Sequence, residues 1–265
     1  MKRRRPLLLI ALGMTVLVLP AGLPLAQPPG QRDLGGDADF DEMTPDTPPP
    51  PGISQRVFIH LPRTGKPGRL GTCTLTTNDG VHDYGLAGWR LPDGGIIWTL
   101  NPSTVPASVG SAAAVTALSA AFATWTKADG KEKFVRSEGS TAATRPRFDS
   151  VNAVLWGKIS AGAIAITYVW HYTDTEVVAE VDTVFNSHYP WAVFDPRNGD
   201  ECQSAPDAYD VQDIATHEFG HWVGLDDLYL SLDRDLTMYG YGAGGELKKR
   251  TLGTGDITGV RAVAP

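Results

Sequence analysis

The chain has 265 residues and a net charge of −7 at neutral pH, and its length allows one large domain or two small ones. Removal of residues 1–26, which hold four basic side chains and no acidic one, would leave 19 basic against 30 acidic residues, a net charge of −11. Polyanionic partners attract basic surfaces, so this balance excludes nucleic acids and anionic membranes as binding partners.

The first 26 residues have the three-part layout of a secretory signal peptide. A basic run at 2–5 precedes an apolar stretch at 7–19, and a tail of prolines and small residues follows. The alternative is a membrane anchor, but Pro20 ends the apolar run short of the ~20 residues that a span needs. We therefore expect cleavage near Ala21 or Ala26, a secreted, extracellular protein, and no stable membrane insertion after cleavage.

Residues 27–52 have the composition of a disordered linker, with many prolines, an acidic run and few apolar side chains. An N-terminal segment follows at 53–88, and its beginning, 53–62, is predicted to form a β-strand. The two cysteines, Cys73 and Cys202, predict one disulfide in an oxidising compartment. The alternative is a free Cys73 thiol that keeps the protein latent.

Residues 89–265 carry the clearest pattern and are predicted to form the main domain. The expected elements are a strand at 94–102, a helix at 108–130, strands around 133–137, 152–159, 163–172 and 176–186, and helices at 209–224 and 253–263. Trp125 recurs with other apolar residues at helical spacing, so it is expected in the core. This order predicts an α+β fold, with a mixed twisted sheet, two long helices and a C-terminal helix.

A candidate metal site lies in the stretch "ATHEFGHWVGLDDLY", residues 215–229. His217 and His221 are four positions apart, so on a helix both imidazoles face the same side. Glu218 stands at the margin of that face, where its carboxylate can reach a metal-activated water without binding the metal. Zinc best matches two imidazoles, a carboxylate and an open fourth position. The alternative is a solvated helix face with two surface histidines.

Three further residues, Gly224, Asp227 and Met238, follow this motif and strengthen the metal hypothesis. Gly224 is expected to end the helix in a left-handed turn, which would bring Asp227 back toward the metal. Its neighbour Asp226 would then point away. Met238 follows in "LTMYGY", where it would form an apolar floor beneath the ligands. This order of residues follows the metzincin signature, H-E-x-x-H-x-x-G-x-x-ligand with a later methionine turn.

Through these motifs, the stretch 94–263 resembles a bacterial matrixin-like metalloprotease of the metzincin clan. The matching pieces are "WTLNP", "AFATW", "AITYVWHY", "AEVDTVFN", "ATHEFGHWVGLDD", "LTMYGY" and "LGTGDITGVRAV". The resemblance implies the following roles: zinc ligands His217 and His221, general base Glu218, and Met-turn residue Met238. Matrixins generally carry histidine where this chain has Asp227, and the aspartate is similar to that of snapalysin-type small secreted proteases.

The resemblance implies a secreted zinc-dependent endopeptidase that hydrolyses protein or peptide substrates with a zinc-activated water and Glu218 as the base. Its substrate would lie antiparallel along an edge strand, 164–172, with Tyr239 and Tyr241 lining the pocket beyond the scissile bond. We expect a monomer. One alternative is a secreted, non-catalytic zinc-binding module, which would not need the base. Another is a zincin whose third ligand is a distant glutamate such as Glu246.

Other acidic and histidine side chains raise the question of further metal sites. Four carboxylates could bind calcium or could form a polar sheet face: Asp174, Glu176, Glu180 and Asp182. A second, structural zinc site could involve His171, Asp174 and His188, and the alternative is that these histidines lie at the surface.

Overall fold

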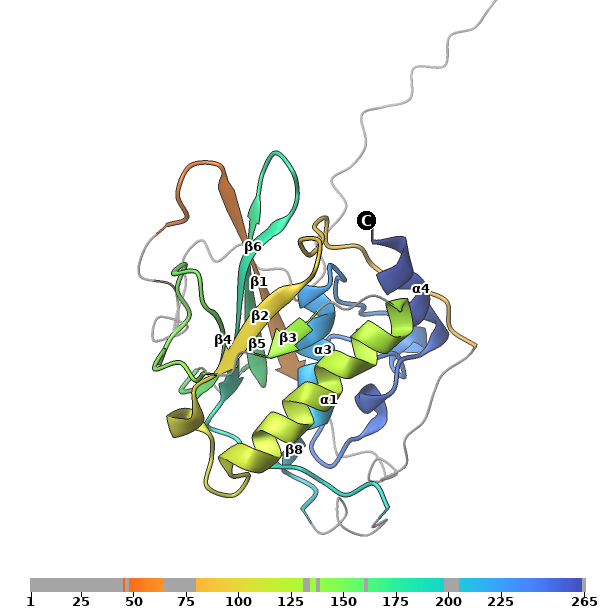
Figure 1. Ribbon diagram of the computed structural model, residues 1–265. Helices are drawn as coiled ribbons and strands as arrows, with labels where there is room; N and C mark the ends of the chain where they lie inside the picture. Colours follow the sequence, from red (N-terminus) through yellow and green to blue (C-terminus); the bar gives the residue numbers. More distant parts are fainter. Residues whose placement is uncertain are drawn as a thin grey trace, which may run out of the picture.

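Figure 1 shows the computed structural model, which describes residues 45, 48–63, 80–130, 134–136, 139–159, 162–197 and 205–263. The predicted signal peptide, most of the predicted linker, and both cysteines, Cys73 and Cys202, lie outside the described residues. Their cleavage, disorder and pairing therefore stay predictions. Within the described ranges, no helix is both long enough and apolar enough to cross a membrane.

A mixed β-sheet forms one layer of the molecule. Its strands lie in the order β3 (Phe134–Arg136), β2 (Ile96–Leu100), β4 (Asn152–Gly157), β6 (Val178–Asn186), β5 (Ala165–Tyr172), β1 (Ile53–Pro62) and β9 (Tyr241–Gly242). The first four strands run parallel, β5 is antiparallel to both β6 and β1, and β9 is parallel to β1. A short separate pair joins β7 (Trp191–Ala192) and β8 (Tyr209–Asp210). The α+β class with a mixed sheet is therefore confirmed.

The helices cover one face of this sheet (Figure 1). They are α1 (Ser111–Asp129), α3 (Val211–Trp222) and α4 (Thr254–Ala262), with short 3-10 turns η1 (Pro102–Thr104), η2 (Ser231–Asp233) and η3 (Lys248–Arg250). All three predicted helices are confirmed, with ends that differ by a few residues. The C-terminal α4 lies beside the end of α1, where Arg261 donates a hydrogen bond to the carbonyl of Ala128 at 2.9 Å.

Aromatic packing holds α3 between α1 and the sheet. The rings of Phe122 and Phe219 stack with centroids 3.6 Å apart. Trp125 is fully buried, as expected, and its indole N–H donates to the carbonyl of Thr216 at 2.7 Å. On the sheet side, Trp222 donates to the hydroxyl of Thr183 at 2.9 Å. Because close-packed aromatic rings leave little room for movement, α3 is fixed from both sides.

The prediction that residues 164–172 form an edge strand is wrong. β1 covers that side of β5 through eight residue pairs, from Ile53↔Tyr172 to His60↔Ala165. The reason lies in the apolar residues of β1. Val57 and Ile59 pack into an apolar cluster with Ile166 of β5, and this packing favours the pairing of β1 along the edge of β5.

A buried ion pair anchors the start of α3. The Asp210 carboxylate caps the helix by accepting from the Asp213 N–H at 2.8 Å. The same carboxylate accepts two hydrogen bonds from Arg250, at 2.7 and 2.5 Å, and a third from the N–H of Phe194 at 3.0 Å. A carboxylate removed from water needs such partners, and here they tie α3 to η3 and to the loop before β8.

We predict that Arg250→Ala lowers the free energy of unfolding by about 3–5 kcal/mol, because it leaves the buried Asp210 charge without its partner. Chemical denaturation followed by circular dichroism measures this change. The matched control is Arg197→Ala, whose pair with Asp195 has side chains 89% and 40% exposed, against 6% and 0% for Arg250 and Asp210. The control should keep the wild-type midpoint. Equal midpoints for the two variants would contradict the prediction.

Candidate metal centre

The turn after α3 requires a glycine. Gly224 has φ +98°, the left-handed region, and a Cβ there would overlap the carbonyl oxygen of Trp89. Its N–H donates to the carbonyl of His221 at 3.1 Å, and the N–H of Leu225 donates to that of Gly220 at 3.0 Å. The chain therefore reverses within a few residues of the helix end, as the sequence predicts.

This reversal brings Asp227 back to the two helix histidines. Oδ1 of Asp227 lies 3.2 Å from Nε2 of His217 and 3.7 Å from Nε2 of His221. The three side chains form one of two groups, within the described residues, whose donor atoms lie close enough to share a metal ion. Asp226 points elsewhere, and its carboxylate pairs with Arg56 at 3.2 Å. The predicted donor set thus comes together, and it could hold a metal ion.

Hydrogen bonds fix both imidazoles in the tautomer that a metal ligand needs. Nδ1 of His217 lies 2.8 Å from the carbonyl oxygen of Thr237, and Nδ1 of His221 lies 2.9 Å from that of Leu225. A carbonyl only accepts, so each Nδ1 must carry the proton and each Nε2 must present a lone pair. Such a backbone partner on the far nitrogen is typical of metal-binding histidines.

The donor atoms fit a cation better than they fit one another. A deprotonated imidazole nitrogen and a carboxylate oxygen are both acceptors, so neither can satisfy the other. Within the described residues, Nε2 of His217 and Oδ1 of Asp227 have no hydrogen-bond donor, although both are buried. Because a buried polar atom without a partner costs free energy, a cation between these donors would remove an unfavourable feature.

The electrostatics of the two imidazoles agree with metal binding, which needs neutral histidines. Burial lowers the pKa of His217 well below its usual value and lowers the pKa of His221 to about 3, so both imidazoles stay neutral. Burial also raises the pKa of Asp227, against the opposing effects of His221 and of the Tyr229 hydroxyl. That hydroxyl donates to Oδ2 of Asp227 at 3.1 Å and leaves Oδ1 directed at the histidines.

Glu218 lies beside the donors and belongs to the second metal-capable group, with His217 and His60. Its Oε2 accepts a hydrogen bond from Thr167 at 2.7 Å, and its Oε1 lies 3.1 Å from Nδ1 of His60. Burial raises the pKa of Glu218 to about 8, an effect that the Thr167 hydrogen bond partly opposes. A nearby positive charge favours the ionised form, so a bound cation would lower this pKa.

Met238 lies beneath the helix between the two histidines. Its side chain is buried, and a Cβ on Gly220 would overlap its sulfur. The backbone N–H groups of Thr237 and Met238 both donate to the Asp256 carboxylate, at 2.9 and 3.1 Å. The turn that supplies the carbonyl for His217 is therefore itself held by a buried acidic side chain at the start of α4.

Tyr239 and Tyr241 form an aromatic cluster near this turn. Their ring centroids lie 5.5 Å apart, and Tyr241 contacts Tyr229 with centroids at 5.6 Å. Tyr241 also pairs with Leu61 of β1. Their predicted role in lining a substrate pocket stays a prediction, but the structure does set both tyrosines next to the metal-capable residues.

The other proposed metal sites do not assemble in the described residues. Glu246 pairs with Arg63 and Lys248, each at 3.2 Å, and belongs to neither metal-capable group. His171 stacks against Trp89, and His188 is exposed beside Tyr189, which favours the surface-histidine alternative.

The four carboxylates considered for calcium separate into two pairs. Asp174 and Glu176 are exposed, whereas Glu180 and Asp182 are buried on β6. Both buried carboxylates accept backbone N–H groups from the loop around Asp149. These contacts favour the alternative of a polar sheet face that holds a loop.

Four residues around the centre were not among those that the sequence predicted for the site: His60, Thr167, Tyr229 and Lys249. Lys249 is fully buried, and its ammonium group donates to the carbonyls of Thr237 (2.9 Å) and Tyr239. Burial lowers its pKa to about 8. Each of these residues lies far from the helix motif in sequence or carries no metal-site signature, and only His60, a histidine in the apolar second half of the strand 53–62, offered a signal.

No model of a known protein family matches this chain, and no curated protein has significant similarity to it. The function must therefore be argued from the centre itself.

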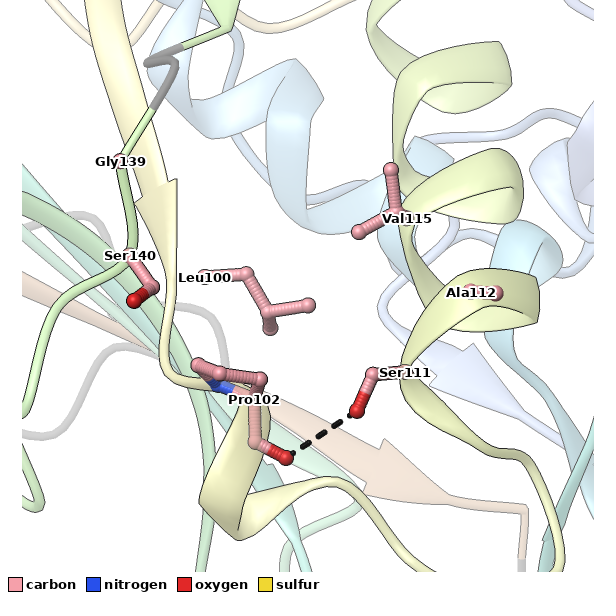
Figure 2. Close-up of a pocket in the computed structure, with 7 residues that line it drawn as sticks. All are labelled: Leu100, Pro102, Ser111, Ala112, Val115, Gly139 and Ser140. Carbon is pink, nitrogen blue, oxygen red and sulfur yellow. Dashed lines mark hydrogen bonds between the residues drawn. The ribbon is translucent and has the colours of Figure 1, made fainter.

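A separate hollow of about 420 Å³ lies between the end of β2 and the start of α1 (Figure 2). Its lining consists of Leu100, Pro102, Ser111, Ala112, Val115, Gly139 and Ser140. The Ser111 hydroxyl donates to the carbonyl of Pro102 at 3.2 Å, so its one hydrogen is already used. With no titratable side chain in its lining, this hollow has no group suited to acid–base chemistry.

We predict that Asp227→Ala abolishes tight metal binding, because it removes one of three converging donors. Asp226→Ala is the matched control, since Asp226 pairs with Arg56 instead. Both variants would be loaded with zinc, dialysed, and analysed for metal content together with wild type. Wild-type metal content in Asp227→Ala would refute the assignment.

Proposed function

We propose that the chain is a secreted zinc-dependent endopeptidase of metzincin type that acts on protein or peptide substrates. The observation that carries this proposal is the position of Glu218 beside three converging donors. Glu218 shares a metal-capable group with His60 and His217 and lies outside the group of His217, His221 and Asp227, a position from which it could act as a general base.

Zinc suits this donor set because two imidazoles and one carboxylate leave a fourth position for water or substrate. When bound, zinc would act as a Lewis acid and lower the pKa of a water molecule. Glu218 would take the proton from that water and later deliver it to the amine that leaves. Thr167 holds the Glu218 carboxylate in place through Oε2, at 2.7 Å, so proton transfer would use Oε1, which lies 3.1 Å from Nδ1 of His60.

The order of elements also supports a metzincin-like fold. The three donors come from α3 and from the turn after Gly224, and Met238 lies under the same helix, as the motif predicts. The mixed sheet with an antiparallel β5 places an extended strand alongside the helix that carries the motif.

A second candidate is a non-catalytic metal-binding module. The observation that favours it is burial, because His217, Glu218 and His221 are each at most 1% exposed. Structural zinc sites are closed, but they use four protein ligands, whereas this donor group has three. The three-donor set favours the enzyme.

We predict that Glu218→Ala retains zinc but loses peptide hydrolysis by a factor of about 10²–10⁴ or more, because the base is removed and the donors remain. Casein zymography and a fluorescent casein assay, each with and without a chelator, measure the activity, and metal analysis measures the zinc. Glu176→Ala, at an exposed position, is the matched control and should behave as wild type. Full hydrolysis by zinc-loaded Glu218→Ala would refute the mechanism, and chelator-resistant hydrolysis would refute the metal requirement.

A further inference from the structure

Two buried threonines lie opposite one another on adjacent strands of the sheet. Thr167 of β5 pairs with Thr183 of β6, and their hydroxyl oxygens lie 2.7 Å apart. Both residues are fully buried. A buried hydroxyl group costs free energy unless it is hydrogen-bonded, and a valine would fill the same space without that cost. The two hydroxyls therefore need partners, and α3 supplies them.

The partners on α3 are Glu218 and Trp222, which are four positions apart and so lie on one side of the helix. Glu218 accepts a hydrogen bond from Thr167 through Oε2 at 2.7 Å. The indole N–H of Trp222 donates to the hydroxyl oxygen of Thr183 at 2.9 Å. These four residues form one unbroken row of hydrogen bonds, from Trp222 through the two threonines to Glu218, which we call the threonine row.

The two ends of the threonine row fix the direction of every bond in it. An indole N–H can only donate, and an ionised carboxylate can only accept. Thr167 gives its one hydroxyl hydrogen to Glu218, so the hydrogen between the two threonines comes from Thr183. Reversing the row would leave the Thr183 hydroxyl hydrogen without an acceptor among the residues that the structure describes. The row therefore presents a hydrogen-bond donor to Glu218.

This fixed direction distinguishes the two oxygens of Glu218. A hydrogen bond to an ionised carboxylate makes protonation of the accepting oxygen less favourable, and Oε2 is the oxygen that accepts from Thr167. Oε1 takes no part in the threonine row and lies 3.1 Å from Nδ1 of His60. Oε1 is therefore the more basic oxygen, and a proton that Glu218 takes up resides there.

We propose that Thr183 and Trp222 are positioning residues for Glu218 and that they act through Thr167. This role rests on the proposed function, because it takes Glu218 to be the general base. Each hydrogen bond in a row polarises the next, so loss of the Thr183 hydroxyl weakens the bond that Thr167 donates. The row ends at an indole N–H, which is a donor only, so it orients the carboxylate and carries no proton away.

Steady-state kinetics of full-length, zinc-loaded variants in the fluorescent casein assay tests this role. Thr183→Val keeps the shape of the side chain and removes the hydroxyl, so kcat should fall about fivefold while KM and zinc content stay unchanged. Thr167→Val removes the bond to Glu218 itself and should lower kcat about 50-fold. Thr183→Ser retains the hydroxyl and should keep kcat within about twofold of wild type. Circular dichroism verifies that each variant is folded.

The matched control is Thr216→Val, the same substitution on α3. Thr216 is also fully buried, but its hydroxyl donates to the carbonyl of Gln212 within the helix, at 2.7 Å. This variant should keep the wild-type kcat. The proposal would be overturned by an equal loss of kcat in Thr216→Val, by an unchanged kcat in Thr183→Val, or by a loss in Thr183→Ser as large as that in Thr183→Val.

Nuclear magnetic resonance tests the threonine row without any need for activity. In protein with isotope-labelled tryptophan, the indole N–H signal of Trp222 reports the bond farthest from Glu218, and Trp222→Phe assigns that signal. Glu218→Gln replaces a charged acceptor by a neutral one, so the Trp222 signal should move upfield. The control is the indole N–H of Trp191, which donates to the carbonyl of Asn186 at 2.8 Å and should keep its position.

The two measurements separate failure of this inference from failure of the proposed function. A Trp222 signal that stays in place in Glu218→Gln, or one that moves no more than the Trp191 signal, would overturn the threonine row. A Trp222 signal that moves in a protein without any peptide hydrolysis would support the row and refute the proposed function.

Discussion

The candidate centre depends on one backbone constraint, the left-handed turn at Gly224. His217 and His221 share a helix face because of their spacing alone, whatever the helix packs against. Asp227 reaches them only because the chain reverses direction directly after α3. The close approach of the Trp89 carbonyl leaves no room for a side chain at the turn. Trp89 in turn donates to the carbonyl of His221 at 2.9 Å, so the same tryptophan limits the turn sterically and holds the helix end through a hydrogen bond.

Charge is balanced around this turn by groups from distant parts of the chain. The centre brings together the buried acidic side chains of Glu218 and Asp227, and an unpaired charge is costly at a buried position. The buried ammonium group of Lys249 lies 3.5 Å from Nδ1 of His217 and supplies a positive charge on the side away from Asp227. α3 is fixed at its start by Asp210 and Arg250, so the helix cannot shift to relieve these charges.

The helices and the candidate metal donors could be predicted from the sequence, because both depend on the spacing of residues close together in the chain. Helical periodicity predicted α1 and α3, and the four-residue spacing of His217 and His221 predicted their convergence. The place of β1 in the sheet could not be predicted, because pairing between distant strands depends on which apolar faces are left uncovered. For the same reason residues 164–172 were expected at an edge, and His60 was not expected at the centre. The spacing after Gly224 selected Asp227 over Asp226, and the structure places Asp227 beside the histidines and Asp226 beside Arg56.

The pairing of β1 has a consequence for how the chain folds. His60 and Glu218 are 158 positions apart, and contacts of such separation form slowly because a long loop must close first. Synthesis proceeds from the N-terminus, so β1 is made well before either β5 or β9. We therefore expect the sheet and helices to assemble first and β1 to be added among the last steps. A newly made molecule would pass through a stage in which its centre is already formed and still open.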